Sequence, residues 1–175
     1  GAGAPVAAFL AVGSKAAGFA VLGRVCLVAF PAFAPAWSVI LGTLAGLSMA
    51  VGSILAMAQT NVKRMLAYSS IAHAGYALLA VIPGTPEDIG SAACYLFAYA
   101  FMTLGAFAVV IRLGKRGEEL KGYEGLAAQS PGIAALMLVF LLSLTGIPPT
   151  AGFAAKFLVF KSALSSGHVT LAVLG

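Results

Sequence analysis

A lysine inside an apolar stretch is the residue of this sequence best suited to proton chemistry. Lys156 occurs in SLTGIPPTAGFAAKF (143–157), where its nearest neighbours are alanine and phenylalanine. Ionisable groups are costly inside a membrane and usually mark an ion path. The sequence therefore predicts a hydrated site at which Lys156 binds and releases a proton. The alternative is a lysine whose long side chain reaches the membrane surface.

A second lysine, Lys15, follows Ser14 within another apolar stretch. The small residues Ala16, Ala17 and Gly18 leave room around its side chain. Two lysines in one water-filled path repel each other, so protonation of one favours release of a proton from the other. Lys15 is therefore a second candidate for proton transfer.

Polar side chains form a stripe along KRMLAYSSIAHAGY (63–76). At 100° per residue, five of them fall within roughly 140° of the helix circumference: Lys63, Ser69, Ser70, His73 and Tyr76. A titratable imidazole among hydrogen-bonding groups can relay protons, which makes the stripe a candidate polar axis. Two alternatives stay open: His73 can be a structural hydrogen-bonding group, and Lys63 with Arg64 can anchor the helix at the membrane surface.

Four residues predict a break in the helix that carries Lys156: Gly146, Pro148, Pro149 and Thr150. The apolar stretch 132–164 would be about 50 Å long as one straight helix, whereas the hydrocarbon core is only about 30 Å thick. The prolines remove backbone donors, and threonine can bond the backbone groups that are freed. The sequence therefore predicts two half-helices that meet inside the bilayer. Because helical side chains lean toward the N-terminus, the Lys156 amine should reach back toward the break. A simple proline kink is the alternative.

Composition identifies an integral membrane protein. Of the 175 residues, 61% are apolar and 9% are charged, against roughly 25% charged in soluble domains, and the mean hydropathy is +1.04. All the acidic residues lie in two short polar segments. The sequence has no basic patch of the kind that binds nucleic acid, so the surroundings we expect are a lipid bilayer and other membrane proteins.

Five apolar stretches reach the length of about 20 residues that a spanning helix needs. They cover 6–30, 37–59, 65–82, 91–113 and 132–164, and 168–175 would begin a sixth. Connections 60–64 and 112–122 carry lysine and arginine, whereas 31–37 and 83–90 carry neither. This alternation is the positive-inside pattern. We therefore expect an all-α, polytopic bundle of about five transmembrane helices, one of them discontinuous. The chain begins without methionine and stops within an apolar stretch, so we expect it to be truncated at both ends.

Residue spacing gives no sign of a metal or cofactor site in this chain. The sequence lacks a dinucleotide fingerprint and a cysteine cluster. Cys26 and Cys94 are far apart in apolar surroundings, and both are expected to be buried, inert thiols.

Two motifs together carry a specific resemblance. QTNVKRMLAYSSIAHAGY (59–76) and LSLTGIPPTAGFAAKFLVF (142–160) resemble the subunit N family, one of the antiporter-like membrane subunits of respiratory complex I, the NADH-quinone oxidoreductase. The first motif is shared with Mrp-type cation/proton antiporters. The second is distinctive, since subunit M has glutamate where this chain has Lys156, and subunit L differs around the prolines.

The resemblance implies a fold and a set of site residues. The family forms a fourteen-helix bundle with two inverted five-helix repeats, each of which contains one broken helix. Residues 1–30 would be the last helix of the first repeat, and 37–175 most of the second. Lys15 would be the connecting lysine, Lys156 the broken-helix lysine, and His73 and Lys63 part of the polar axis.

The resemblance also implies an activity, with its cofactors and partners. The expected activity is proton translocation coupled to quinone reduction elsewhere in the complex. NADH, FMN, iron–sulfur clusters and quinone would bind to other subunits. The expected partners are neighbouring antiporter-like and small membrane subunits, in the bacterial inner membrane. Two other functions stay open: a subunit of an Mrp-type sodium/proton antiporter, and a membrane scaffold that transports nothing. The lack of a carboxylate within the apolar stretches argues against sodium binding, since hard cations prefer oxygen ligands.

Overall fold

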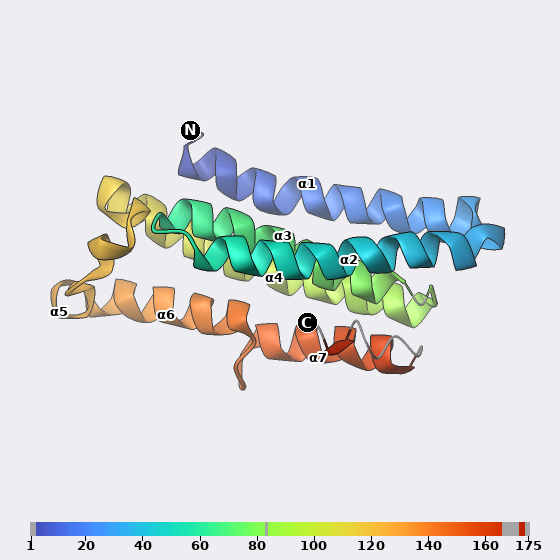
Figure 1. The fold of residues 1–175 in the computed structure, drawn as a ribbon. Coiled ribbons are helices and arrows are strands. Elements are labelled where there is room, and N and C mark those ends of the chain that lie inside the picture. Colours follow the sequence, from blue (N-terminus) through green and yellow to red (C-terminus); the bar gives the residue numbers. More distant parts are fainter. Residues whose placement is uncertain (1–2, 83, 166–171, 174–175) are drawn as a thin grey trace.

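A computed structural model of the chain describes residues 3–82, 84–165 and 172–173. These residues form a bundle of long helices that run side by side along one axis (Figure 1). Its α-helices are α1 (Ala4–Arg24), α2 (Ala34–Met57), α3 (Val62–Val81), α4 (Pro86–Leu113), α5 (Leu126–Gln129), α6 (Pro131–Thr145) and α7 (Ala151–Ser165). Within the described ranges there is no strand, and the prediction of an all-α membrane bundle is confirmed.

Helices α1 and α2 form a hairpin at one end of the bundle (Figure 1). A π-helical turn (Val25–Ala29) extends α1, and a 3₁₀ turn (Pro31–Phe33) leads into α2. Trp37 closes the hairpin, because its indole Nε1 donates a hydrogen bond to the Phe30 carbonyl at 3.2 Å.

Helices α2 and α3 pack closely because glycine stands where they meet. A Cβ atom built on Gly75 would lie 2.7 Å from the Ala45 carbonyl oxygen, and one on Gly52 would lie 2.5 Å from the Ala72 nitrogen. The side chain of Asn61 caps the start of α3 by accepting a hydrogen bond from the Arg64 N–H at 3.0 Å. These contacts fix α3, which carries the predicted polar stripe, directly against α2.

Helix α4 is the central element and contacts α1, α3, α6 and α7. Thr85 and Asp88 form a capping box at its start, in which each side chain bonds the backbone N–H of the other residue. Tyr95 and Phe107 are fully buried along its length. The helices that carry the predicted site residues therefore have α4 as their common neighbour.

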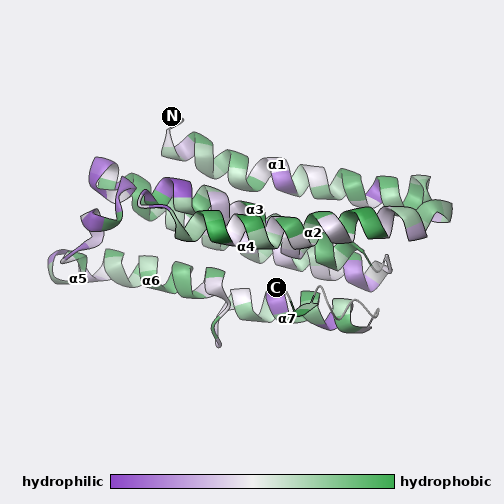
Figure 2. Ribbon diagram, in the orientation of Figure 1, coloured by the Kyte–Doolittle hydropathy of each residue, from purple (hydrophilic) through white to green (hydrophobic). Residues whose placement is uncertain are grey.

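The two connections that carry basic residues meet at the same end of the bundle, as the charge pattern predicts. The backbone N–H of Leu120 donates to the Thr60 carbonyl at 3.1 Å, and Asn61 forms an antiparallel bridge with Glu119. Arg116 holds the longer connection together by donating to two of its backbone carbonyls and to a glutamine side chain. Hydrophilic residues gather at this end, near α5, while the helices are mostly hydrophobic (Figure 2).

Three helical segments of the described chain are long and apolar enough to cross a membrane: Ala4–Ala29, Pro31–Met57 and Glu87–Glu118. Large apolar side chains such as Phe9, Val28 and Met57 are exposed on their outer faces, as expected for surfaces that contact lipid. The third predicted span is α3, whose polar residues lower its hydropathy, and the fifth is the pair α6–α7. The predicted start of a sixth span, 168–175, lies outside the described residues except for 172–173.

Candidate functional site: a polar layer beside a broken helix

The helix break lies where the sequence predicts it. Helix α6 ends at Thr145, α7 begins at Ala151, and the fifth span is therefore two half-helices of 15 residues each. Gly146 adopts the left-handed conformation (φ +87°) and donates its N–H to the Leu142 and Ser143 carbonyls. A residue with a side chain is strained in this conformation, so glycine is the residue that allows α6 to stop here.

The residues between the half-helices satisfy much of their own backbone. The Ile147 N–H donates to the Leu142 carbonyl at 3.1 Å. The Thr150 hydroxyl donates to the Ile147 carbonyl at 2.6 Å and accepts from the Phe153 N–H at 3.4 Å. The peptide bond between Pro148 and Pro149 is cis. The two hydrogen bonds of the Thr150 hydroxyl support the irregular backbone at the break, as the sequence predicts.

Ser143 and Gly152 join the two half-helices directly. The Gly152 N–H donates to Ser143 Oγ at 3.1 Å, and that hydroxyl contacts Met102 Sδ on α4 at 2.7 Å. A Cβ atom on Gly152 would overlap the Ser143 carbonyl, so only glycine fits at this contact. The first turn of α7 is thereby fixed to the last turn of α6 and to α4.

Lys156 reaches back to the break, as predicted. Its Nζ donates to the Thr145 carbonyl, the last residue of α6, at 3.1 Å. The same amine lies over the ring of Tyr76 on α3, 4.6 Å from the ring centre. Gly146 leaves room for this path, since a Cβ atom there would lie 3.0 Å from Lys156 Cδ. Lys156 therefore connects the open end of α6 to the polar stripe of α3.

His73 is buried at the centre of the bundle, with 5% of its surface exposed. Its Nδ1 atom and the Tyr95 hydroxyl form a hydrogen bond of 2.5 Å. The rings of Tyr76 and Tyr99 are neighbours, with centroids 5.8 and 4.9 Å from that of the imidazole. This environment holds the imidazole in place and keeps it away from lipid.

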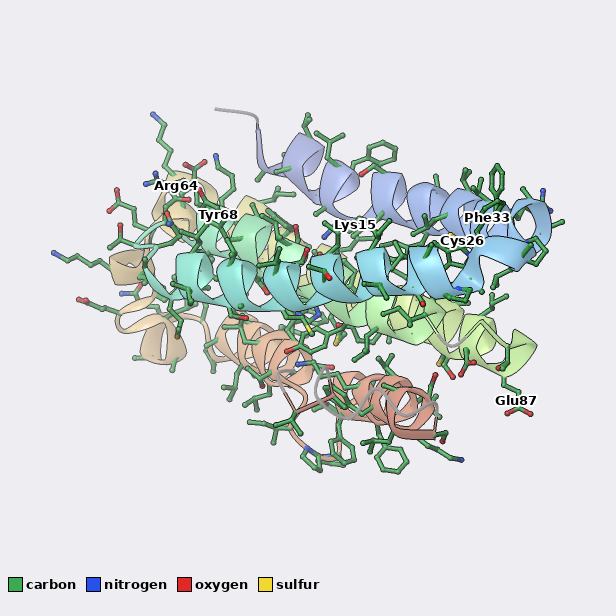
Figure 3. The ribbon with its side chains drawn as sticks, turned by 45° about the vertical axis from the view of Figure 1, so that its right-hand side comes forward. Lys15, Cys26, Phe33, Arg64, Tyr68 and Glu87 are labelled. Atoms are coloured by element: carbon green, nitrogen blue, oxygen red, sulfur yellow. The ribbon has the colours of Figure 1, made fainter. Side chains whose placement is uncertain are left out.

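Lys15 approaches the same place from α1. Figure 3 shows it midway along the bundle, between Arg64 near one end and Glu87 at the other. Its Nζ donates a hydrogen bond to the Ser70 carbonyl on α3, and it lies 5.2 Å from the centre of the Tyr99 ring on α4. The structure therefore brings each predicted lysine to a tyrosine ring that neighbours His73.

These residues form a row in which basic side chains alternate with tyrosine rings. Its order is Lys15, Tyr99, His73, Tyr76, Lys156, and four helices contribute to it. We refer to these five residues as the basic–tyrosine row. Like charges along such a row repel one another.

The tyrosines of the row belong to the apolar core. Tyr76 is part of one cluster, which includes Ala80 and Val159, and Tyr99 is part of the other, which includes Leu66 and Leu144. The row thus joins the two apolar clusters of the bundle.

Two of the predicted polar residues, Lys63 and Ser69, lie away from the basic–tyrosine row, and a third, Ser70, adjoins it through its carbonyl bond to Lys15. Lys63 lies at the basic end, where its Nζ pairs with Glu118 at 3.1 Å. Ser69 is half-buried and lines a groove of about 340 Å³ that also contains Thr145. Ser70 and Tyr76, by contrast, are buried beside His73. Lys63 is therefore paired with a carboxylate away from the row, and both its predicted part in the polar axis and the alternative of a surface anchor stay predictions.

Sequence reasoning missed two groups of residues. Tyr95, Tyr99 and Thr103 recur every fourth residue on α4 and face the row, and this spacing could have revealed them. At the non-basic end, the buried carboxylate of Asp88 accepts a hydrogen bond from Ser162 on α7. The Thr85-x-x-Asp88 pattern predicts a helix cap, but no sequence signal predicts its contact with Ser162.

No group of three histidine, cysteine, aspartate or glutamate residues in the described chain is arranged to hold a metal ion. Cys26 is buried as expected, but the expectation for Cys94 is wrong. Its side chain is exposed and lines an apolar groove beside the break.

Known proteins are similar to this chain over its whole length. Residues 1–175 match the family described as NADH:quinone oxidoreductase/Mrp antiporter, TM. Among curated proteins, NADH-quinone oxidoreductase subunit N of Desulfovibrio desulfuricans is 54% identical over 95% of this chain and 36% of that protein. The subunit of the same name from Trichlorobacter lovleyi is 48% identical over 100% of this chain and 37% of its own length. The chain thus spans just over a third of these relatives.

Solved structures share the fold. Respiratory complex I from Thermus thermophilus with bound NADH contains a chain that is 35% identical, with a TM-score of 0.75 over 82% of this chain and 31% of that chain. The Mrp complex from Dietzia sp. contains a chain with a TM-score of 0.76 over 89% of this chain and 29% of that chain. At 22% identity, this second likeness shows the fold alone.

Proposed function

The chain belongs to the NADH:quinone oxidoreductase/Mrp antiporter membrane family, and we propose that it conducts protons as part of subunit N of an NADH-quinone oxidoreductase. The names of its relatives support this assignment. The observation that carries it is the position of Lys156, which bonds the open end of α6 and faces Tyr76 beside His73. A half-buried lysine held at a helix break, next to other titratable groups, is arranged to bind and release a proton.

In the proposed mechanism, protons move along the basic–tyrosine row. Lys15 and Lys156 bind a proton on Nζ, and His73 binds one on its imidazole. Because His73 Nδ1 is bonded to the Tyr95 hydroxyl, Nε2 is the ring nitrogen that exchanges a proton with the row. Arrival of a proton at either lysine raises the positive charge beside His73, and repulsion then favours release at the other lysine.

The relationship to the longer relatives is also proposed. Residues 1–30 would be the last helix of the first repeat, and residues 37–175 most of the second. Quinone, NADH, FMN and iron–sulfur clusters would be held by other subunits, which drive this one in the bacterial inner membrane. Neighbouring antiporter-like and small membrane subunits would supply the rest of the path.

The experiment is Lys156→Met in the full-length subunit of the assembled complex, reconstituted in liposomes. We expect normal assembly with proton pumping and coupled NADH oxidation largely lost. Lys161→Met is the matched control, because Lys161 is an exposed lysine five residues later on the same half-helix, and it should pump like the wild type.

Two other results would point to other functions. Unchanged pumping in Lys156→Met would indicate that the chain is a membrane scaffold and that Lys156 takes no part in proton transfer. Proton movement that required a sodium gradient and continued without electron transfer would indicate an Mrp-type antiporter. Both outcomes contradict the proposal.

A further inference from the structure

Two buried hydroxyl groups on α4 have no hydrogen-bond partner in the described part of the chain. They are the Tyr99 hydroxyl and Thr103 Oγ1, on residues that are each 2% exposed. The two residues are four positions apart, so they lie one helical turn from each other on one face of α4. Buried polar groups in proteins are nearly always bonded to protein or to ordered water.

The backbone does not satisfy Thr103 in the way that it satisfies other hydroxyls in this chain. Ser14, Thr43, Ser91 and Ser165 each donate to the carbonyl four residues earlier in their helix. Thr103 makes no such bond. Its hydroxyl is therefore available for a ligand on the inner side of α4.

The surroundings of the two hydroxyls are polar on one side. The Tyr99 hydroxyl is close to the side chains of Ser70 and Thr103, although it forms no hydrogen bond of normal geometry with either. Ser70 Oγ donates to the Ala67 carbonyl at 2.6 Å, which leaves its oxygen able to accept. The Lys15 amine, bonded to the Ser70 carbonyl, completes a group of donors and acceptors from three helices.

We propose that Tyr99 and Thr103 hold an internal water molecule, with Ser70 Oγ as its third partner. A water molecule offers two donors and two acceptors, and each hydroxyl offers one donor and two acceptors. Three partners are typical for a buried water.

The role of this water rests on the proposed function. Tyr99 is the ring between Lys15 and His73 in the basic–tyrosine row. A water bound to its hydroxyl accepts a proton from Lys15, or returns one, without passing through His73. The water thus gives Lys15 a second exchange partner, and Tyr99 and Thr103 act as positioning residues.

The first test is structural and uses the whole assembled complex. A high-resolution cryo-electron microscopy map should show a water within about 2.7–3.2 Å of both hydroxyl oxygens. The density should disappear in Thr103→Val and remain in Thr103→Ser. A map without this water, or one in which the two hydroxyls bond each other directly, would overturn the site.

The second test is functional. Tyr99→Phe keeps the ring beside Lys15 and His73 but removes the hydroxyl, and Thr103→Val replaces the hydroxyl with a methyl group of similar size. Each should lower proton pumping several-fold and change its solvent deuterium isotope effect, and the double variant should be no worse than the single variants. Thr43→Val, which removes an exposed hydroxyl on α2, should have no effect.

The outcomes separate this inference from the proposed function. If the water is present but Tyr99→Phe and Thr103→Val pump normally with an unchanged isotope effect, its role in proton transfer is refuted, whatever Lys156→Met does. If Lys156→Met pumps normally, the proposed function fails, while the map alone still decides whether the water site exists.

Discussion

The amine of Lys156 lies 4.6 Å from the centre of the Tyr76 ring, so a lysine on the second half-helix of a broken span faces the helix that carries His73. The same amine is bonded to the Thr145 carbonyl on the first half-helix. Lys156 is therefore positioned by both sides of the break and by α3. Changes that disturb any of these contacts should alter where its proton is held.

Gly146→Ala should disturb the break. Alanine at φ +87° is strained by about 1–2 kcal/mol, and its Cβ would lie 3.0 Å from Lys156 Cδ. We expect a lower thermal midpoint of the subunit and reduced pumping, because the lysine must move. Gly132→Ala on α6 is the matched control, since a Cβ there meets nothing within 4 Å. Equal behaviour of the two variants would show that the break tolerates a side chain at this position.

Tyr95→Phe should weaken the fixation of His73. It removes the hydroxyl bonded to Nδ1 and leaves a buried ring nitrogen unpaired, at a cost of about 1–3 kcal/mol in the free energy of unfolding. Pumping should fall as well, because the imidazole loses its fixed orientation. The control is Tyr68→Phe, which removes the hydroxyl of a half-buried tyrosine on α3. It should lower the free energy of unfolding much less. Full stability and pumping in Tyr95→Phe would indicate that packing alone orients His73.

Asp88→Ala should loosen the non-basic end, where α4 and α7 meet. The variant removes the partner of Ser162 and one side of the capping box, and loss of a cap costs about 0.5–2 kcal/mol. We expect a drop in thermal midpoint larger than that of Glu87→Ala, an exposed acidic residue in the same helical turn. A drop no larger than that of the control would mean that the Ser162 contact adds no stability.

Gly75→Ala tests the contact between α2 and α3. Its Cβ would lie 2.7 Å from the Ala45 carbonyl oxygen, and overpacking of this kind costs about 1–3 kcal/mol. We expect poor assembly or a clearly lower thermal midpoint. Gly18→Ala on α1 should be neutral or slightly stabilising, since a Cβ there meets nothing within 4 Å and alanine favours helix. A stable Gly75→Ala variant would show that the two helices can separate without cost.

The helix break was predictable because its causes are local. The length of 132–164, the paired prolines and the flanking glycines act through backbone sterics and membrane thickness, which sequence reports directly. The backward reach of Lys156 follows from helix geometry in the same way. The central position of His73 was also visible, since it lies on the polar face of an otherwise apolar helix.

The neighbours of these residues were only partly predictable from local pattern. The spacing of Tyr95 and Tyr99 places them on one face of α4, but whether that face meets α3 depends on how the helices pack. The pairing of Lys63 with Glu118 joins residues 55 positions apart, through two connections that meet only in the folded bundle. The contact of Asp88 with Ser162 depends likewise on where α7 ends beside α4.

The glycine contact between α2 and α3 has a mechanical consequence for the two ends of the site. Because their backbones are in direct contact at Gly52 and Gly75, α2 and α3 should move together as one rigid unit, which carries His73. Lys156 lies on α7, a separate helix of 15 residues that is joined to α6 through residues 146–150. A change in the distance between the imidazole and the amine therefore comes from the Lys156 side chain or from a shift of α7, while α3 serves as the fixed frame.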